Sequence, residues 1–156
     1  MKGKDYTACC GLYCPDCIWY QNSVSTLAKK LRDTLDEIDF RKYASVKSPF
    51  GTELEYYDEF IDILNFMAAN DCTSPCPVGG GCGGRPCRIM ECAEEKGLEG
   101  CWQCEEMEEC SYFEIVRPRC GDTPMENLRN IKKYGYDGWI DKRGPYYIWQ
   151  KKNKPE

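Results

Sequence analysis

Two pairs of cysteines separated by two residues carry the clearest chemical meaning in the sequence. One pair is Cys14 and Cys17, in CPDC, and the other is Cys101 and Cys104, in CWQC. Two thiolates at this spacing on a turn can bind one tetrahedral metal ion without strain. The 156 residues include 13 cysteines and no histidine. A zinc or iron site must therefore use thiolates, and enzymes that need a Ser-His or Cys-His pair or a histidine-bound catalytic zinc are excluded.

Further cysteines supply enough sulfur for two or three zinc ions, each held by four thiolates. The candidate ligands are Cys10, Cys14, Cys17, Cys72, Cys76, Cys82, Cys87, Cys92, Cys101, Cys104 and Cys110. The first predicted site combines Cys10, Cys14 and Cys17 with either Cys72 or Cys76. The second combines Cys87, Cys92, Cys101 and Cys104, with Cys82 and Cys110 as alternative ligands. Cys9 and Cys120 fit these spacings least well and are interpreted as free thiols.

An Fe–S cluster is the main alternative, because thiolates suit iron as well as zinc. The absence of both the bacterial and the plant-type ferredoxin spacing favours zinc. Cys10, Cys14 and Cys17 also have the CxxxCxxC spacing of radical S-adenosylmethionine enzymes, but the chain lacks the alternating strands and helices of their partial barrel. Four thiolates close the zinc shell, so we expect a structural metal and a non-enzymatic binding module. The acidic run at 105–109 is interpreted as a solvated face.

Charge is distributed unevenly along the chain. Residues 127–156 hold eight Lys and Arg against three Asp and Glu, whereas the whole chain has a net charge of −5. Aromatic residues interleave with this basic charge, which leaves single-stranded nucleic-acid binding as a second alternative. The overall negative charge favours instead a packed aromatic tail with surface lysines and a protein partner. No apolar segment resembles a secretory signal or a membrane span, so we expect a cytoplasmic protein.

The elements that must position these cysteines are predicted to be mainly helical. One helix carries an apolar face of Val24, Leu27, Leu31, Leu35 and Ile38, and a second begins at a capping box of Thr52 and Glu55, with Leu54, Tyr57, Ile61, Leu64 and Met67 on its apolar face. The two helices are predicted to pack against each other and against the N-terminal cysteines. A short helix over Arg88–Lys96 ends at Gly97, and another begins with Thr123 as cap and stops at Gly135.

The predicted fold is a single metal-stabilised domain over residues 1–156. It comprises a cysteine knuckle at 9–17, a two-helix insert at 20–70, a Cys-rich metal-binding block at 71–120, and a helix with an aromatic, basic tail at 121–156. The Gly/Pro/Cys-rich loops have little to bury and need metal ligation for order. A Gly-Pro turn in the tail would join two short strands in a small C-terminal β-hairpin.

Several of these motifs occur together in one known family. CGLYCPDCIWY at 10–20, a C-x4-C pair before a short helix ending in KG, and CWQC with a trailing cysteine resemble the uncharacterised cysteine-rich prokaryotic family catalogued as domain of unknown function 3795. The matching positions are Cys10, Cys14, Cys17, Cys82, Cys87, Cys92, Cys101, Cys104 and Cys110. The resemblance implies a small cytosolic metal-binding protein and brings no established activity. Cys9, Cys120 and the long aromatic tail depart from the pattern.

Overall fold

The computed structural model of the chain describes residues 3–20, 23–79, 86–144, 147 and 149. These residues form two compact units. Unit 1 comprises Met1–Tyr20 and Ser74–Glu156, and unit 2 comprises Gln21–Thr73. Unit 2 corresponds to the predicted two-helix insert, and all the predicted metal ligands except Cys72 belong to unit 1. None of the described helices combines the length and the apolar character needed to cross a membrane.

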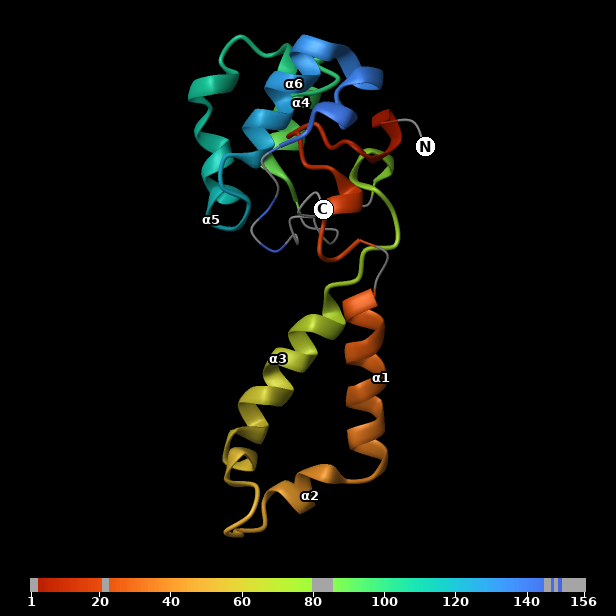
Figure 1. Cartoon of the computed structure of the whole chain (residues 1–156), viewed down its shortest axis with the longest axis vertical. Helices are drawn as coiled ribbons and strands as arrows, with labels where there is room; N and C mark the ends of the chain where they lie inside the picture. The colour runs from red at the N-terminus through yellow and green to blue at the C-terminus, as the bar shows by residue number, and fades with distance from the viewer. Residues whose placement is uncertain (1–2, 21–22, 80–85, 145–146, 148, 150–156) are drawn as a thin grey trace, which may run out of the picture. The chain divides into compact units, whose positions relative to one another are not determined.

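The fold is mainly helical, as predicted (Figure 1). The α-helices are α1 (Ser23–Glu37), α2 (Phe40–Ala44), α3 (Tyr57–Ala69), α4 (Arg88–Glu95), α5 (Arg117–Cys120) and α6 (Thr123–Gly138). Short 3₁₀-helices connect them: η1 (Gly3–Tyr6), η2 (Cys14–Asp16), η3 (Thr52–Tyr56), η4 (Cys76–Val78), η5 (Cys101–Gln103), η6 (Met107–Glu109), η7 (Ser111–Ile115) and η8 (Ile140–Lys142). Within the described ranges there is no strand, and an isolated antiparallel bridge pairs Thr7 with Tyr13.

Unit 2 is an antiparallel pair of helices, α1 and α3, joined through α2 and η3 (Figure 1). Both predicted helices exist, but the second starts later than the capping box indicated. Gly51 has φ 73°, Thr52 and Glu55 lie in η3, and no side chain caps this turn. Regular α-helix begins only at Tyr57, which is buried with its ring 5.6 Å from that of Phe40. Aromatic packing, rather than capping, therefore sets the start of α3.

The buried seam of unit 2 differs from the predicted apolar face of the first helix. Ala28, Leu64 and Ala68 are buried between α1 and α3, with Leu35, Ile61 and Met67 partly buried around them. The Leu27 side chain is 67% exposed and Ile38 is 63% exposed. The small Ala28 and Ala68 let the helices approach closely, which leaves the larger apolar side chains of α1 outside the seam.

In unit 1, α4 follows the prediction closely. The helix spans Arg88–Glu95, and Gly97 has φ 66°. The Leu98 amide donates to the Ala93 carbonyl at 2.8 Å, and the Gly97 amide donates to the Glu94 carbonyl at 3.0 Å. These two bonds are a Schellman motif, which needs a left-handed residue at the helix end. The prediction that Gly97 ends this helix is confirmed.

The long helix α6 differs at both ends from its prediction. Thr123 is its first residue rather than its cap, and Asp122 precedes it without a side-chain capping bond. Gly135 leaves helical geometry at φ 72° and ψ 170°, so the helix is interrupted at the predicted stop and then continues to Gly138. Met125, Leu128 and Ile131 are buried, as expected for the inner face.

The core of unit 1 gathers apolar residues from both of its chain segments. Its buried members are Ala8, Cys10, Tyr13, Ile89, Trp102, Met107, Phe113, Met125, Leu128, Ile131 and Trp139. In the tail, η8 occupies Ile140–Lys142, so the part just before the Gly-Pro turn is helical instead of extended. The rest of the predicted β-hairpin falls largely on residues 145–146, 148 and 150–156, which lie outside the described residues.

Candidate metal centre

The two CxxC segments fold into turns with the same local geometry. In the first, the Tyr13 carbonyl accepts a hydrogen bond from the Asp16 amide at 3.0 Å. In the second, the Gly100 carbonyl accepts one from the Gln103 amide at 3.1 Å. In both turns, the carbonyl of the first cysteine accepts one from the amide of the second cysteine, at 2.9 and 3.0 Å. Cys17 has φ −75° and ψ 133°, and Cys104 has φ −79° and ψ 132°. We call these segments the CPDC turn (residues 14–17) and the CWQC turn (residues 101–104).

A third turn repeats this pattern at Cys76, with Gly79 in the place of the second cysteine. The Val78 amide donates to the Pro75 carbonyl at 3.1 Å, and the Gly79 amide donates to the Cys76 carbonyl at 3.2 Å. Gly79 has φ 92°, a conformation that glycine adopts without strain. Cys76 thus lies at the start of a turn of the CxxC type, although its spacing in the sequence does not identify one.

The CPDC turn and the Cys76 turn lie next to each other in unit 1. The Cys76 backbone amide donates to Cys14 Sγ at 3.4 Å. Cys10 and Cys14 are buried, whereas Cys17 is exposed. Of the two alternatives for the fourth ligand of the first site, Cys76 thus lies beside the CPDC turn, and Cys72 belongs to unit 2.

The CWQC turn is joined to the N-terminal segment through Cys9. The Cys101 amide donates to the Cys9 carbonyl at 2.8 Å, and the two thiols are hydrogen-bonded. With Cys101 as donor, this bond holds the pKa of Cys9 below its ordinary value. The same bond raises the pKa of Cys101, and burial and the nearby Cys10 and Cys110 raise it further. Sequence spacing indicated Cys9 as a poor fit, because this contact depends on chain segments that only the fold brings together.

A lysine at the end of α4 lies beside the CWQC turn. Lys96 Nζ donates to a Glu106 carboxylate oxygen at 2.6 Å and lies 3.8 Å from Cys104 Sγ. Glu106, then Cys104, and to a lesser degree Cys92, raise the pKa of Lys96. This ammonium group would stabilise negative charge on the neighbouring thiols.

Sulfurs from both predicted sites pack around the core of unit 1. These cysteines are Cys9, Cys10, Cys76, Cys87, Cys101, Cys104 and Cys110. Cys87 directly precedes α4, and Cys92 lies within it. Across the described ranges, no three Cys, Asp or Glu side chains converge in an arrangement that could hold a metal ion. Cys82 lies outside the described residues, and Cys120 is close enough to Tyr147 to raise its pKa.

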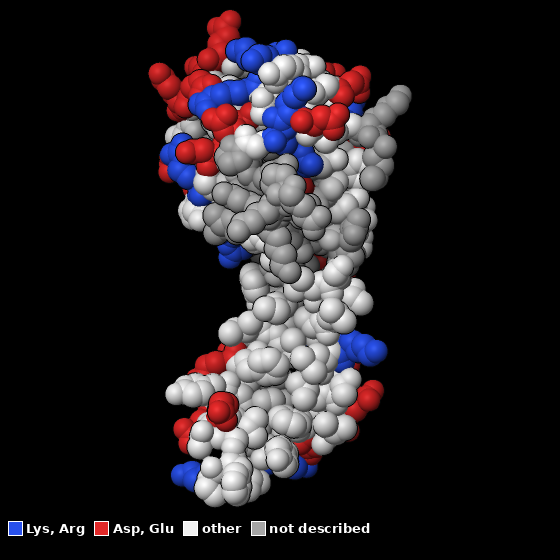
Figure 2. All heavy atoms as spheres, viewed as in Figure 1, with Lys and Arg blue, Asp and Glu red and all other residues white. Residues whose placement is uncertain are grey.

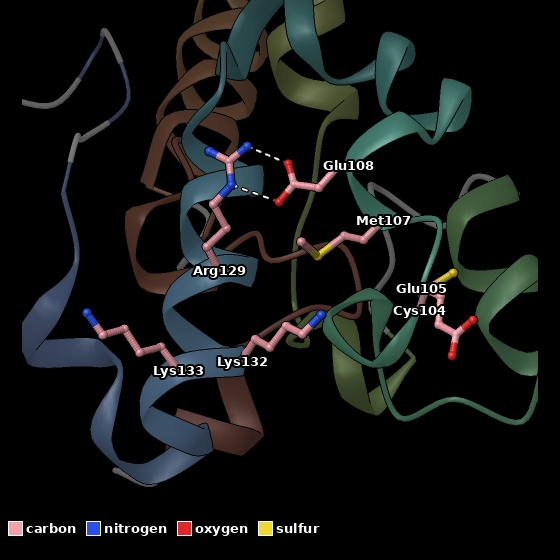
Figure 3. A pocket seen from close by; sticks show the side chains of 7 residues that line it. All are labelled: Cys104, Glu105, Met107, Glu108, Arg129, Lys132 and Lys133. Carbon is pink, nitrogen blue, oxygen red and sulfur yellow. Dashed lines mark hydrogen bonds and ion pairs between the residues drawn. The ribbon is translucent and has the colours of Figure 1, made fainter.

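A surface pocket of about 260 Å³ lies next to the CWQC turn (Figure 3). Its lining combines charges of both signs around one thioether: Cys104, Glu105, Met107, Glu108, Arg129, Lys132 and Lys133. The Arg129 guanidinium and the Glu108 carboxylate face each other along one side, and Lys132 and Lys133 project separately from α6 (Figure 3). Because two of its cations, Lys132 and Lys133, have no ion pair among the described residues, the pocket is weakly basic.

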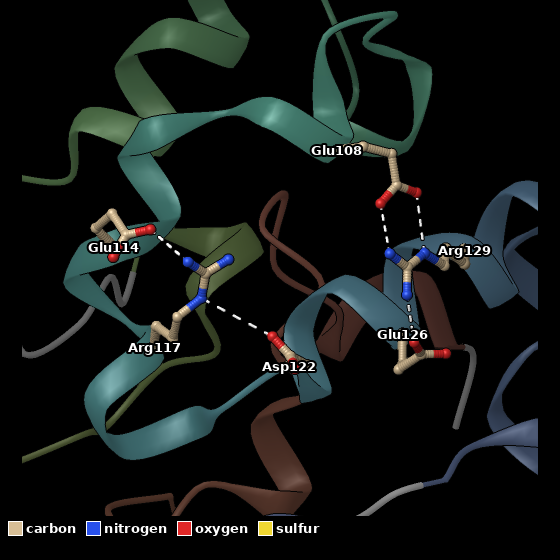
Figure 4. Close-up of polar contacts among 6 residues, drawn as sticks. All are labelled: Glu108, Glu114, Arg117, Asp122, Glu126 and Arg129. Atoms are coloured by element: carbon tan, nitrogen blue, oxygen red, sulfur yellow. Dashed lines mark hydrogen bonds and ion pairs between the residues drawn. The ribbon is translucent and has the colours of Figure 1, made fainter.

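Ion pairs connect α6 to the loops that precede it (Figure 4). Arg129 Nε donates to Glu108 at 2.9 Å, and the same guanidinium pairs with Glu126. Arg117 pairs with Glu114 and lies 3.8 Å from Asp122. The acidic run at 105–109 is therefore solvated, as predicted, with two of its carboxylates in exposed pairs of the kind that contribute little to stability.

The aromatic tail packs into unit 1. Trp139 is fully buried, and Tyr147 is buried with its ring stacked 4.7 Å from that of Trp149. The Trp149 indole donates to the Asp16 carbonyl at 3.1 Å, and Arg143 pairs with the Asp16 carboxylate. The tail thus contacts the CPDC turn through Asp16, a role for which the sequence contains no signal. The prediction of a packed aromatic tail is confirmed for these residues.

A known protein family matches most of the chain. Residues 6–115 match a family described as Protein of unknown function (DUF3795). The chain belongs to this family. The DUF3795 match covers both CxxC turns, unit 2 and α4, and it ends before α6, Cys120 and the aromatic tail. It confirms the resemblance found in the motifs and assigns no activity. No curated protein and no solved structure matches the chain.

Proposed function

We propose that the protein is a non-enzymatic binding module whose unit 1 is held together by zinc ions bound to cysteine thiolates. The observation that carries this proposal is the shared geometry of the CPDC and CWQC turns, which have the same hydrogen-bond pattern and the same extended second cysteine. Turns of this kind present two sulfurs to one ion. The hydrogen bonds that form the two turns are made by backbone atoms, so the turns do not depend on the cysteine sulfurs.

The contacts around each turn support a ligand set. For the first site they support Cys10, Cys14, Cys17 and Cys76, because the Cys76 amide already hydrogen-bonds the Cys14 sulfur. Amide bonds to ligand sulfurs orient the ligands and stabilise their charge.

For the second site the predicted ligands are Cys87, Cys92, Cys101 and Cys104, with Cys82 and Cys110 as alternatives. The contact between Cys9 and Cys101 adds Cys9 to these alternatives. Two thiolates bound to one tetrahedral zinc at about 2.3 Å lie about 3.8 Å apart, which is also the range of a hydrogen bond between sulfurs. The Cys9 and Cys101 thiols lie close enough for each to shift the pKa of the other. Lys96 would partly balance the negative charge of a site with four thiolates.

A structural role agrees with the composition of the loops. The chain has no histidine, and a four-thiolate shell leaves zinc no open position for a substrate. The binding role is supported by unit 2, where ten of the described large apolar side chains are exposed. Metal ligation would supply to unit 1 the free energy that its Gly/Pro-rich segments cannot obtain from apolar burial.

Metal content of protein purified without exposure to air tests this proposal. We expect two or three zinc ions per chain by elemental analysis. Cys14→Ser and Cys101→Ser should each lower the stoichiometry by about one ion, and Cys120→Ser, the matched control outside the ligand sets, should leave it unchanged. Stoichiometric iron with broad visible absorption would establish the Fe–S alternative instead. Protein without metal, with its thiols oxidised to disulfides, would contradict both.

Chelation tests the structural role separately from metal identity. Because a zinc site exists only in the folded chain, removal of zinc should lower the thermal midpoint of unit 1. The four tryptophans all lie in unit 1, so their fluorescence reports on that unit. An unchanged melting curve after complete removal of the metal would exclude a structural role.

A further inference from the structure

Unit 2 buries less apolar surface than its composition allows. Between α1 and α3 only Ala28, Leu64 and Ala68 are buried together. Two helices of 15 and 13 residues with so small a seam gain little free energy to offset the ordering of their backbones. The stability of this hairpin therefore requires a further surface against which it packs.

A groove on unit 2 is lined mainly by apolar side chains of α1, α2, η3 and α3, among them the exposed Leu31, Tyr56 and Phe60. It has a volume of about 390 Å³ and is lined by Leu31, Leu35, Phe40, Glu53, Leu54, Tyr56, Tyr57 and Phe60. Figure 2 shows a nearly continuous uncharged face over unit 2, with Lys, Arg, Asp and Glu side chains gathered at its edges. An apolar area with a charged rim is typical of a protein interface.

Helical periodicity separates this face from the buried seam. At about 100° per residue, Leu27 and Leu31 of α1 and Ile38, which directly follows α1 and keeps the helical bond to the Thr34 carbonyl, fall within about 40° of one another. On α3, Tyr56, Phe60 and Ile63 fall within about 60° when the helical spacing is extended back to Tyr56. Each helix thus carries two adjacent apolar stripes, one against its neighbour in the hairpin and one exposed. Helices of a four-helix bundle have this pattern, because each contacts two neighbours.

We propose that the exposed face of unit 2 binds the same face of a second copy of the chain, so that two hairpins form a four-helix bundle. The same surface on both copies suffices for a two-fold interface. Leu27, Leu31, Ile38, Tyr56, Phe60 and Ile63 are 41–67% exposed. Together they would bury about 700 Å² per copy, close to the roughly 800 Å² per partner of a stable interface. This proposal concerns unit 2 alone and does not depend on metal in unit 1.

Charges on unit 2 favour an antiparallel arrangement of the two hairpins. Glu37 ends α1 and Glu59 lies near the start of α3, so both carboxylates lie at the same end of the hairpin. Neither has an ion-pair partner among the described residues of unit 2. A parallel arrangement would bring the two acidic ends together, and a head-to-tail two-fold axis separates them.

Sedimentation equilibrium of the full chain, with its metal content unchanged, tests the proposal. We expect a mass of about 36 kDa, twice the 18.0 kDa of one chain. Phe60→Glu places a charge in the middle of the apolar face and should raise the dimer dissociation constant at least about 100-fold. Ile115→Glu is the control, because Ile115 is an exposed apolar residue of unit 1. A monomer at every soluble concentration, or equal weakening by both variants, would overturn the proposal.

Neutralising this acidic end tests the orientation without altering the apolar face. Glu37→Gln combined with Glu59→Gln should leave the dimer dissociation constant within about 3-fold of wild type, because the two acidic ends lie apart in an antiparallel dimer. Far-ultraviolet circular dichroism checks that the variant keeps its helices. If the double variant strengthens the dimer by more than about 3-fold, the acidic ends meet and the antiparallel arrangement is wrong.

Discussion

Replacing Asn127 by alanine would remove a buried hydrogen bond between α6 and the N-terminal loop. The Asn127 side chain is 1% exposed, and its Nδ2 donates to the Gly11 carbonyl at 2.8 Å. Gly11 is itself buried, between the Cys10 and Cys14 positions of the first predicted site. The bond therefore holds the loop that carries these cysteines against α6.

The expected cost follows from the burial of both groups. Truncation leaves the Gly11 carbonyl without this donor and without access to water, which costs about 1–3 kcal/mol. Loss of the buried side-chain atoms adds a small cavity. We therefore expect Asn127→Ala to lower the free energy of unfolding of unit 1 by about 2–3 kcal/mol. Asn127→Asp keeps the shape and loses the donor, so it should cost at least as much at neutral pH.

Urea denaturation followed by tryptophan fluorescence measures this change, because all four tryptophans belong to unit 1. Asn130→Ala is the matched control, one turn further along α6. Its Nδ2 donates to the Lys142 carbonyl at 3.3 Å from a less buried position, so we expect a loss below about 1 kcal/mol. Equal losses for the two variants, or a loss below about 0.5 kcal/mol for Asn127→Ala, would refute the role given to this bond.

Three further predictions concern backbone space and titration. Gly11→Ala should lower the free energy of unfolding clearly more than Gly97→Ala does. Both glycines have positive φ, but only at Gly11 would the new Cβ meet a backbone oxygen, that of Pro124, at 2.5 Å. Paired denaturation curves of the two variants measure this difference. Arg129→Gln should raise the pKa of Glu108, which Arg129 holds below its ordinary value, and NMR titration of the carboxyl measures the change. Burial raises the pKa of Tyr136 to about 12 from an ordinary value of 10.0. Its contribution to the free energy of unfolding is therefore fully present below pH 10 and is lost as pH rises towards 12. The difference between the absorbance titrations of wild type and Tyr136→Phe should show one late-ionising tyrosine, and ionisation of this tyrosine near pH 10 would contradict the burial argument.

Elements set by local signals were predicted well. Gly97 ends α4 because a left-handed residue closes its Schellman motif, and Gly135 interrupts α6 with a positive φ that glycine adopts without strain. The capping box at Thr52 was wrong, since the burial of Tyr57 on Phe40 outweighed a side-chain cap. The exposed Leu27 likewise shows that periodicity identifies an apolar stripe without saying which neighbour covers it.

For the candidate site, the sequence by itself determined the chemistry and the local turns. CPDC and CWQC are short enough for hydrogen bonds within four residues to fix their conformation, and the lack of histidine restricts strong metal ligands to sulfur. Only the tertiary structure decided which sulfurs lie together. Cys76 reaches Cys14, 62 residues away, and Cys9 reaches Cys101 because α6 and the aromatic tail pack the N-terminal segment against the CWQC turn. Such contacts depend on side-chain packing between distant segments, which cysteine spacing along the chain does not encode.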